Sequence, residues 1–185
     1  MMTEISLNIL DVAENSTRAG ASLVSIAVFT DRAADQLTVI IRDNGRGMTE
    51  EEAARAADPF FTTRTTRKVG LGIPFFKYAA ESTGGSFSIE SEPGTGTAVT
   101  AVFGLSHIDR MPLGDINCTI ETLITCHPDT DFLYHYRYNE ASFELDTRSF
   151  RRILGDIPLN APEVSAFIKE YLRENKLETD GGAVI

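Results

Sequence analysis

The chain has 185 residues, a hydrophobic content of 42% and a formal net charge of −10 at pH 7. This length allows one good-sized domain, or one domain with a substantial appendage. The acidic balance argues against binding nucleic acid through bulk electrostatics. No apolar run approaches the roughly 20 residues that span a bilayer, and no signal peptide opens the chain. We therefore expect a cytoplasmic protein with neither a nucleic-acid nor a membrane partner.

The cysteines and histidines exclude the common metal and disulfide frameworks. Cys118 and Cys126 have no metal-ligand spacing, and we expect both thiols to be buried and reduced. His107, His127 and His135 form no zinc-like pattern.

The first element is a predicted helix from Thr3 to Ala19, which Gly20 ends. Polar residues at i, i+3 and i+7 share one face of it, and such a stripe is either solvated surface or a functional face. Apolar residues with helical spacing form the core-facing side: Ile5, Ile9, Val12 and Ala13. The polar residues are Asn8, Asp11 and Asn15.

Two predicted strands follow, at 23–30 and 36–42, and the second leads into Asp43-Asn44-Gly45-Arg46-Gly47-Met48. A strand that ends in Asp-x-Gly-x-Gly places a carboxylate at the edge of whatever pocket lies beyond it. The glycines remove the Cβ atoms that would block a planar ligand. Taken alone, the same pattern is also typical of an ordinary tight turn.

The next segment reads as a short helix and a basic loop. Thr49 has the position of an N-cap, three glutamates follow it, and the helix runs to about Ala57. Residues 58–68 have no hydrophobic period and carry Arg64, Arg67 and Lys68. A mobile basic loop of this kind could close over phosphates and exclude water.

A glycine pair opens the following helix, which runs from Gly70-Leu71-Gly72 to about Glu81. Backbone N–H groups at such a helix start can cradle phosphate, although an ordinary loop-to-helix junction has the same residues. Two strands, at 86–91 and 97–103, then form a hairpin around the turn at 93–96.

After Gly104 the composition changes, and residues 105–185 predict a helix, a hairpin and two more helices. The aromatic residues that alternate along 132–138 indicate core packing rather than a binding platform. We expect this segment to be a docking or dimerisation appendage, with a frayed tail from Glu178.

Five motifs in order resemble those of the GHKL superfamily of ATP-binding domains, over residues 1–104. Residues 14–21 resemble the N box of mismatch-repair ATPases, and residues 43–48 resemble the first glycine box. Residues 58–64 and 69–73 resemble the F box and second glycine box of histidine kinases. Residues 93–97 are similar to the Gly-x-Gly-Thr hairpin that closes the domain.

The resemblance implies an α/β (α+β) fold, a two-layer sandwich of the Bergerat type with a mixed sheet covered by helices on one face. Residues 1–104 would form the ATP-binding domain, and residues 105–185 a small α+β appendage. ATP would lie between the helices, under a lid from about Phe60 to Gly70.

The resemblance also implies roles for single residues. Asp43 would accept the adenine amine, Thr97 would lie near the adenine, and Asn15 would be the protein ligand of Mg²⁺, which prefers oxygen donors. Asp11 takes the place of the glutamate that activates water in hydrolysing members, one methylene shorter. The other expected nucleotide contacts are Gly45, Gly47, Met48, Phe60, Thr62, Thr63, Arg64, Lys68, Gly70, Leu71 and Gly72.

Three functions remain open, because a fold does not fix a function. The first is a kinase for a separate partner protein, the second is an ATPase that drives a lid or dimer switch, and the third is a non-catalytic nucleotide sensor. None of the three histidines has the context of a phosphoacceptor, so we expect the chain to lack that segment of a sensor kinase. The implied partners are ATP, Mg²⁺, a partner protein and a possible second copy.

Overall fold

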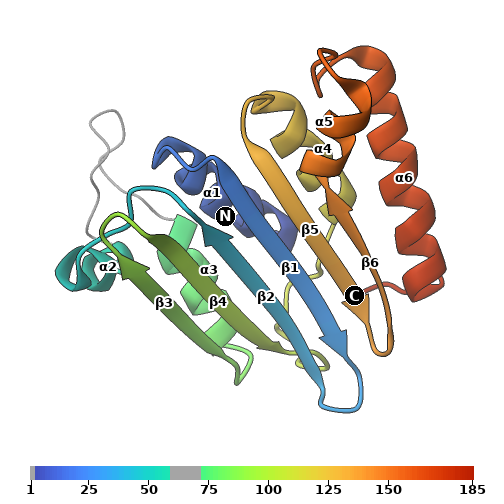
Figure 1. Ribbon diagram of the computed structural model, residues 1–185. Helices are drawn as coiled ribbons and strands as arrows, with labels where there is room; N and C mark the ends of the chain where they lie inside the picture. The colour runs from blue at the N-terminus through green and yellow to red at the C-terminus, as the bar shows by residue number, and fades with distance from the viewer. Residues whose placement is uncertain (1–2, 59–71) are drawn as a thin grey trace.

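The computed structural model describes residues 3–58 and 72–185. They form a six-stranded mixed sheet with the strand order β3-β4-β2-β1-β5-β6, and helices cover one of its faces (Figure 1). This is the predicted two-layer α/β arrangement. The strands are β1 (Leu23–Asp31), β2 (Gln36–Asp43), β3 (Ser86–Glu92), β4 (Gly96–Gly104), β5 (Asp131–Tyr138) and β6 (Ala141–Asp146). The helices are α1 (Ile5–Arg18), α2 (Glu50–Ala56), α3 (Gly72–Glu81), α4 (Ile116–Cys126), α5 (Thr147–Leu154) and α6 (Pro162–Asp180).

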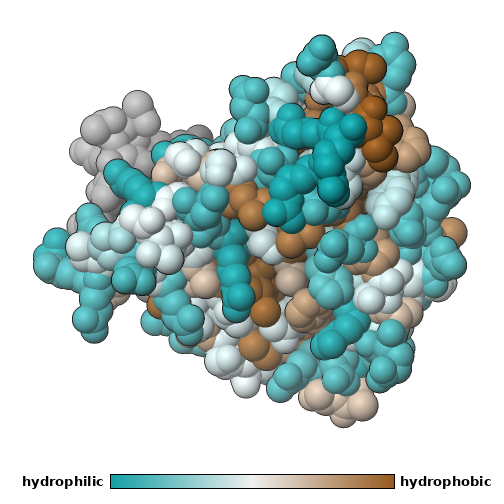
Figure 2. Space-filling view, in the orientation of Figure 1, coloured by the Kyte–Doolittle hydropathy of each residue, from teal (hydrophilic) through white to brown (hydrophobic). Residues whose placement is uncertain are grey.

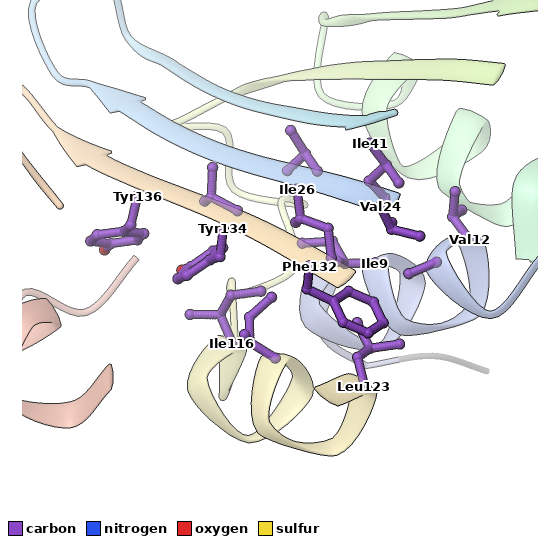
Figure 3. Close-up of a cluster of buried hydrophobic side chains, with 14 of the residues drawn as sticks. Ile9, Val12, Val24, Ile26, Ile41, Ile116, Leu123, Phe132, Tyr134 and Tyr136 are labelled. Atoms are coloured by element: carbon purple, nitrogen blue, oxygen red, sulfur yellow. The ribbon is translucent and has the colours of Figure 1, made fainter. Parts of the chain in front are cut away.

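The core lies between the sheet and its helices. Every second residue of β1 is buried, as expected for a strand with one covered face. Figure 3 shows Val24 and Ile26 of β1 beside Ile9 of α1, with the rings of Phe132 and Tyr134 in the same cluster. The alternating aromatic residues of β5 are therefore core residues, as predicted.

The C-terminal segment extends the same sheet, because β5 pairs with β1 in parallel from Leu23 with Asp131 to Thr30 with Tyr138. Parallel strands need a crossover connection rather than a tight hairpin. The connection contains α4, and it is tied to α1 where the Ile5 amide donates to Pro112 O at 2.9 Å. Residues on either side of Gly104 thus share one core.

The helix starts show how local sequence sets the elements. Thr49 is the N-cap of α2, as predicted, and accepts a hydrogen bond from the Glu52 amide at 3.2 Å. The Glu52 carboxylate accepts from the Thr49 amide at 2.9 Å, which completes a capping box. None of the described helices is long and apolar enough to cross a membrane.

Three expectations about exposure are wrong. Cys118 and Cys126 are exposed free thiols, because the apolar positions that bury α4 lie on its other side. Asn8 is buried and donates from Nδ2 to Glu4 O at 3.3 Å, so it does not share a solvated stripe with Asp11 and Asn15.

The tail from Glu178 is docked rather than frayed. The Ile185 carbonyl accepts from the Leu113 amide at 2.7 Å, and the Ile185 side chain is buried. The buried carboxylate of Asp180 accepts from Tyr136 Oη at 2.8 Å and from Lys176 Nζ at 2.6 Å. Burial raises the pKa of the Tyr136 phenol well above its ordinary value, and Asp180 raises it further, so Tyr136 stays the donor.

Asp180→Ala tests this anchor. The substitution leaves the Tyr136 hydroxyl and the Lys176 ammonium without their shared acceptor, and we expect it to lower the free energy of unfolding by about 2–4 kcal/mol. Urea unfolding followed by circular dichroism measures the loss. The control is Glu178→Ala, an exposed acid on the same helix turn. Equal unfolding midpoints for the two variants would show that the contacts of Asp180 do not stabilise the fold.

Candidate functional site

A cavity of about 370 Å³ opens where the ends of β2 and β4 meet α1 and the start of α3. Its volume lies within the range of about 300–1,000 Å³ that is typical of ligand pockets. Val12, Ile41 and Val99 give it apolar walls. Six residues predicted from the sequence line it: Asn15, Asp43, Gly47, Met48, Gly72 and Thr97.

The Asp43 carboxylate is held in a fixed orientation at the end of β2. Ser16 Oγ on α1 donates to Asp43 Oδ2 at 2.7 Å, and the Gly45 amide donates to Asp43 Oδ1 at 2.9 Å. Hydrogen bonds to a charged acceptor are among the stronger ones in proteins. The site therefore presents a preoriented acceptor at the wall of a partly apolar cavity, which suits an aromatic ligand with an amine.

The glycines of this loop are required by the neighbouring hairpin. A Cβ atom on Gly47, whose φ is +66°, would lie 1.9 Å from Glu92 O. A Cβ atom on Gly96, whose φ is +126°, would lie 1.9 Å from Asp43 O. The loop after β2 and the turn before β4 thus approach each other backbone to backbone, which only glycine permits.

The same contact places Thr97 beside Asp43. The two residues are partners in the register of β2 and β4. Thr97 Oγ1 lies 2.8 Å from Ser91 Oγ, which also accepts from the Met48 amide at 2.8 Å. Ser91 therefore joins Met48 and Thr97 in one small hydrogen-bond network beside the end of β2.

Asp11 lies against the first residue of α3. A Cβ atom on Gly72 would come within 2.2 Å of Asp11 Oδ2, so this glycine lets α3 approach α1. A carboxylate at a helix N-terminus is favourable because the macrodipole is positive there. Asp11 is half-buried and is not among the residues that line the cavity.

Asn15 faces the cavity with an oxygen donor suited to a hard cation. Its Oδ1 accepts from Arg18 Nη1 at 3.2 Å, and Arg18 also lies 3.4 Å from Glu14. A divalent ion bound here would exchange one exposed hydrogen bond for a coordination bond. No group of three or more His, Cys, Asp or Glu side chains gathers at a metal-binding spacing within residues 3–58 and 72–185. A single protein ligand suits Mg²⁺, which keeps several waters and binds together with phosphates.

Several residues of the site were not predicted from the sequence. Ser16 holds Asp43, and Arg18, Arg46, Glu52 and Arg55 line the cavity. Arg18 was within reach of sequence reasoning, since i+3 spacing puts it on the face of Asn15. Seven predicted contacts lie outside the described residues: Phe60, Thr62, Thr63, Arg64, Lys68, Gly70 and Leu71. The predicted lid lies there too.

One more contact joins the site to the C-terminal segment. His127, which ends α4, lies with Nε2 2.7 Å from Glu14 Oε1, and both side chains are 25% exposed. Glu14 directly precedes Asn15 on α1. The imidazole and Arg18 therefore share the Glu14 carboxylate, and Arg18 also lines the cavity.

The model of the family described as histidine kinase-, DNA gyrase B-, and HSP90-like ATPase matches residues 1–107. The chain belongs to this ATPase family. All of the residues that line the cavity lie within the matched region, and the predicted GHKL resemblance is confirmed.

Relatives of this ATPase domain include bacterial kinases. The chain is 33% identical over 113 residues to the non-motile and phage-resistance protein of Caulobacter vibrioides. This match covers 58% of the chain and 13% of that protein. It is 36% identical over 108 residues to sensor protein kinase FleS of Pseudomonas aeruginosa. That match covers 58% of the chain and 26% of the kinase. The chain thus spans about a quarter or less of these relatives.

A solved structure shares the fold. The crystal structure of the N-terminal domain of a DNA repair protein matches with a TM-score of 0.54 at 13% identity, over 78% of this chain and 52% of that one. At this identity the likeness concerns the fold alone.

His127→Ala tests the contact between the C-terminal segment and α1. The variant loses a hydrogen bond between two largely buried groups, and we expect it to lower the free energy of unfolding by about 1 kcal/mol. Thermal unfolding measures this, with the exposed His107→Ala as control. A variant as stable as the wild type would mean that the contact does not fasten the two segments together.

Proposed function

We propose that this ATPase-family chain binds Mg·ATP in the cavity and acts as a kinase or ATP-driven switch on a partner protein. The Asp43 carboxylate carries the proposal, since it is preoriented by Ser16 and Gly45 in the wall of the cavity. It would accept a hydrogen bond from the exocyclic amine of adenine. Val12, Ile41 and Val99 would contact the faces of the base.

The phosphates would extend toward α3 and the basic residues of the cavity. Gly72 begins α3, and backbone amides at a helix start attract anions. Arg18 and Arg46 line the cavity and would add positive charge. Asn15 would hold Mg²⁺, which when bound neutralises phosphate charge.

Turnover would transfer the γ-phosphoryl group of ATP to water or to a side chain of the partner protein, with ADP as the other product. Asp11 lies one helical turn before Asn15 and would take the proton of the attacking group. The bacterial kinases among the relatives support transfer to a protein.

A second candidate is a nucleotide sensor without chemistry. One observation favours it: Asp11 is packed against Gly72 rather than lining the cavity, which places its carboxylate at the start of α3. In a sensor, ATP shifts the population between two states that a partner distinguishes. Incubation with γ-labelled ATP, with and without candidate partner proteins, separates the sensor from the kinase and the hydrolase.

Asp43→Ala tests nucleotide binding. It removes a charged acceptor worth about 1.5–3 kcal/mol, so ATP affinity should fall by about ten- to a hundredfold while the fold stays intact. Calorimetric titration measures the dissociation constant, and circular dichroism checks the fold. Asp109→Ala, an exposed acid outside the cavity, is the matched control. Wild-type affinity in Asp43→Ala would disprove adenine recognition by this carboxylate.

Asp11→Asn tests turnover and preserves the size of the side chain. If Asp11 is the general base, the rate of phosphate release should fall at least tenfold, within the range of about 10²–10⁴ that such bases contribute, at nearly unchanged ATP affinity. Asp11→Glu restores the carboxylate with longer reach and should retain or raise the rate. Unchanged turnover in Asp11→Asn would remove the base and favour the sensor.

A further inference from the structure

The C-terminal segment meets the helix of the nucleotide site along α4. Helices α5 and α6 lie at the β6 side of the sheet, where Figure 2 shows hydrophobic residues gathered over them. Helix α4 instead packs beside α1, and Thr119 Oγ1 donates to Ser6 O in a buried hydrogen bond of 3.3 Å. At the end of α4, His127 Nε2 lies 2.7 Å from Glu14 Oε1. Both contacts join residues that are 113 positions apart in the chain, so α4 lies along α1 in one register.

The Glu14 carboxylate is held through both of its oxygens. An ionised carboxylate only accepts hydrogen bonds, so His127 Nε2 is the donor to Oε1. The other oxygen, Oε2, accepts from Arg18 Nη2 at 3.4 Å, one helical turn further along α1. The side chains of His127 and Glu14 are each 25% exposed, whereas that of Arg18 is 54% exposed. The better-buried pair is therefore the fixed end of this series of contacts, and Arg18 extends from it to the wall of the cavity.

Arg18 has a second acceptor, but it is the oxygen that Mg²⁺ would use. Arg18 Nη1 donates to Asn15 Oδ1 at 3.2 Å. A divalent ion and a guanidinium so close together repel each other, so they would not share this oxygen. With Mg·ATP bound, Glu14 would therefore be the acceptor of the two that keeps Arg18 at the cavity.

We propose that His127 is a positioning residue for nucleotide binding, an inference that rests on the proposed Mg·ATP function of the cavity. His127 fixes the carboxylate of Glu14, and Glu14 holds the guanidinium of Arg18 where it meets the phosphates of ATP. His127 does not itself line the cavity. The C-terminal segment thereby contributes to nucleotide affinity from outside the pocket.

The expected effect follows from the entropy of the arginine side chain. A long side chain that is already held in place loses less conformational freedom when its ligand binds. Without the imidazole, Glu14 loses its buried partner and no longer confines Arg18 to one position. We expect His127→Ala to raise the dissociation constant for Mg·ATP by about two- to tenfold, which is the cost of ordering one such side chain.

A double-mutant cycle tests whether His127 acts through Arg18. Calorimetric titration with Mg·ATP compares the wild type, His127→Ala, Arg18→Ala and the double variant, at a temperature where thermal unfolding shows all four to be folded. Arg18→Ala should weaken binding at least as much as His127→Ala. The double variant should bind as Arg18→Ala does, because the residue that His127 positions is already absent. Losses that add in the double variant would show that His127 supports the cavity by another route, and would overturn the inference.

A conservative substitution separates positioning from a general loss of stability. His127→Gln carries a donor nitrogen the same number of bonds from Cα, so it should recover most of the ATP affinity that His127→Ala loses. His107→Ala, at an exposed histidine outside the cavity, is the matched control and should bind as the wild type does. Wild-type affinity in His127→Ala, or no recovery in His127→Gln, overturns the inference.

Asp43→Ala distinguishes this inference from the function on which it rests. If the wild type binds Mg·ATP and Asp43→Ala weakens it while His127→Ala does not, the proposed function stands and the positioning role of His127 is wrong. A wild type that binds no Mg·ATP overturns the proposed function, and the positioning role with it.

Discussion

The parallel pairing of β5 with β1 is the interaction on which the rest of this structure depends. It joins the ATPase-family region to the C-terminal segment in one sheet, with eight residue pairs from Leu23 and Asp131 onward. Phe132 and Tyr134 of β5 then enter the core beside α1 and α4, and Tyr136 lies toward α6, where its hydroxyl donates to Asp180 (Figure 3). Because these rings are buried among apolar residues of both segments, the two segments share one hydrophobic core.

The cavity depends on the same packing through α1. Once α1 is seated on β1 and β2, Ser16 reaches the end of β2 and fixes Asp43 at 2.7 Å. The backbone of Gly47 can then lie against Glu92 and that of Gly96 against Asp43. The site is thus built mainly from backbone contacts and short polar side chains, which hold an acceptor in place before any ligand arrives.

The cavity lies at the β2–β4 side of the sheet, and α5 and α6 lie at the β6 side (Figure 1). Between them, the 2.7 Å contact of His127 with Glu14 connects the end of α4 to the helix that carries Asn15. The C-terminal segment therefore contacts, through the end of α4, the helix that supplies Asn15 to the cavity.

The sequence by itself determined the secondary-structure elements, because hydrophobic periodicity and turn residues are local signals. Examples are the strands at 23–30 and 36–42, the Thr49 N-cap, and Asp43 followed by glycines. It also indicated the family, because Asn15, Asp43 and Thr97 stand in ordered motifs. Only the tertiary structure decided which strand lies beside β1, because that pairing spans about a hundred residues and depends on how the intervening helix packs. The tertiary structure also decided which helix residues are buried or in contact, because this depends on what each helix face packs against. It buries Asn8, exposes Cys118 and brings Ser16 to Asp43.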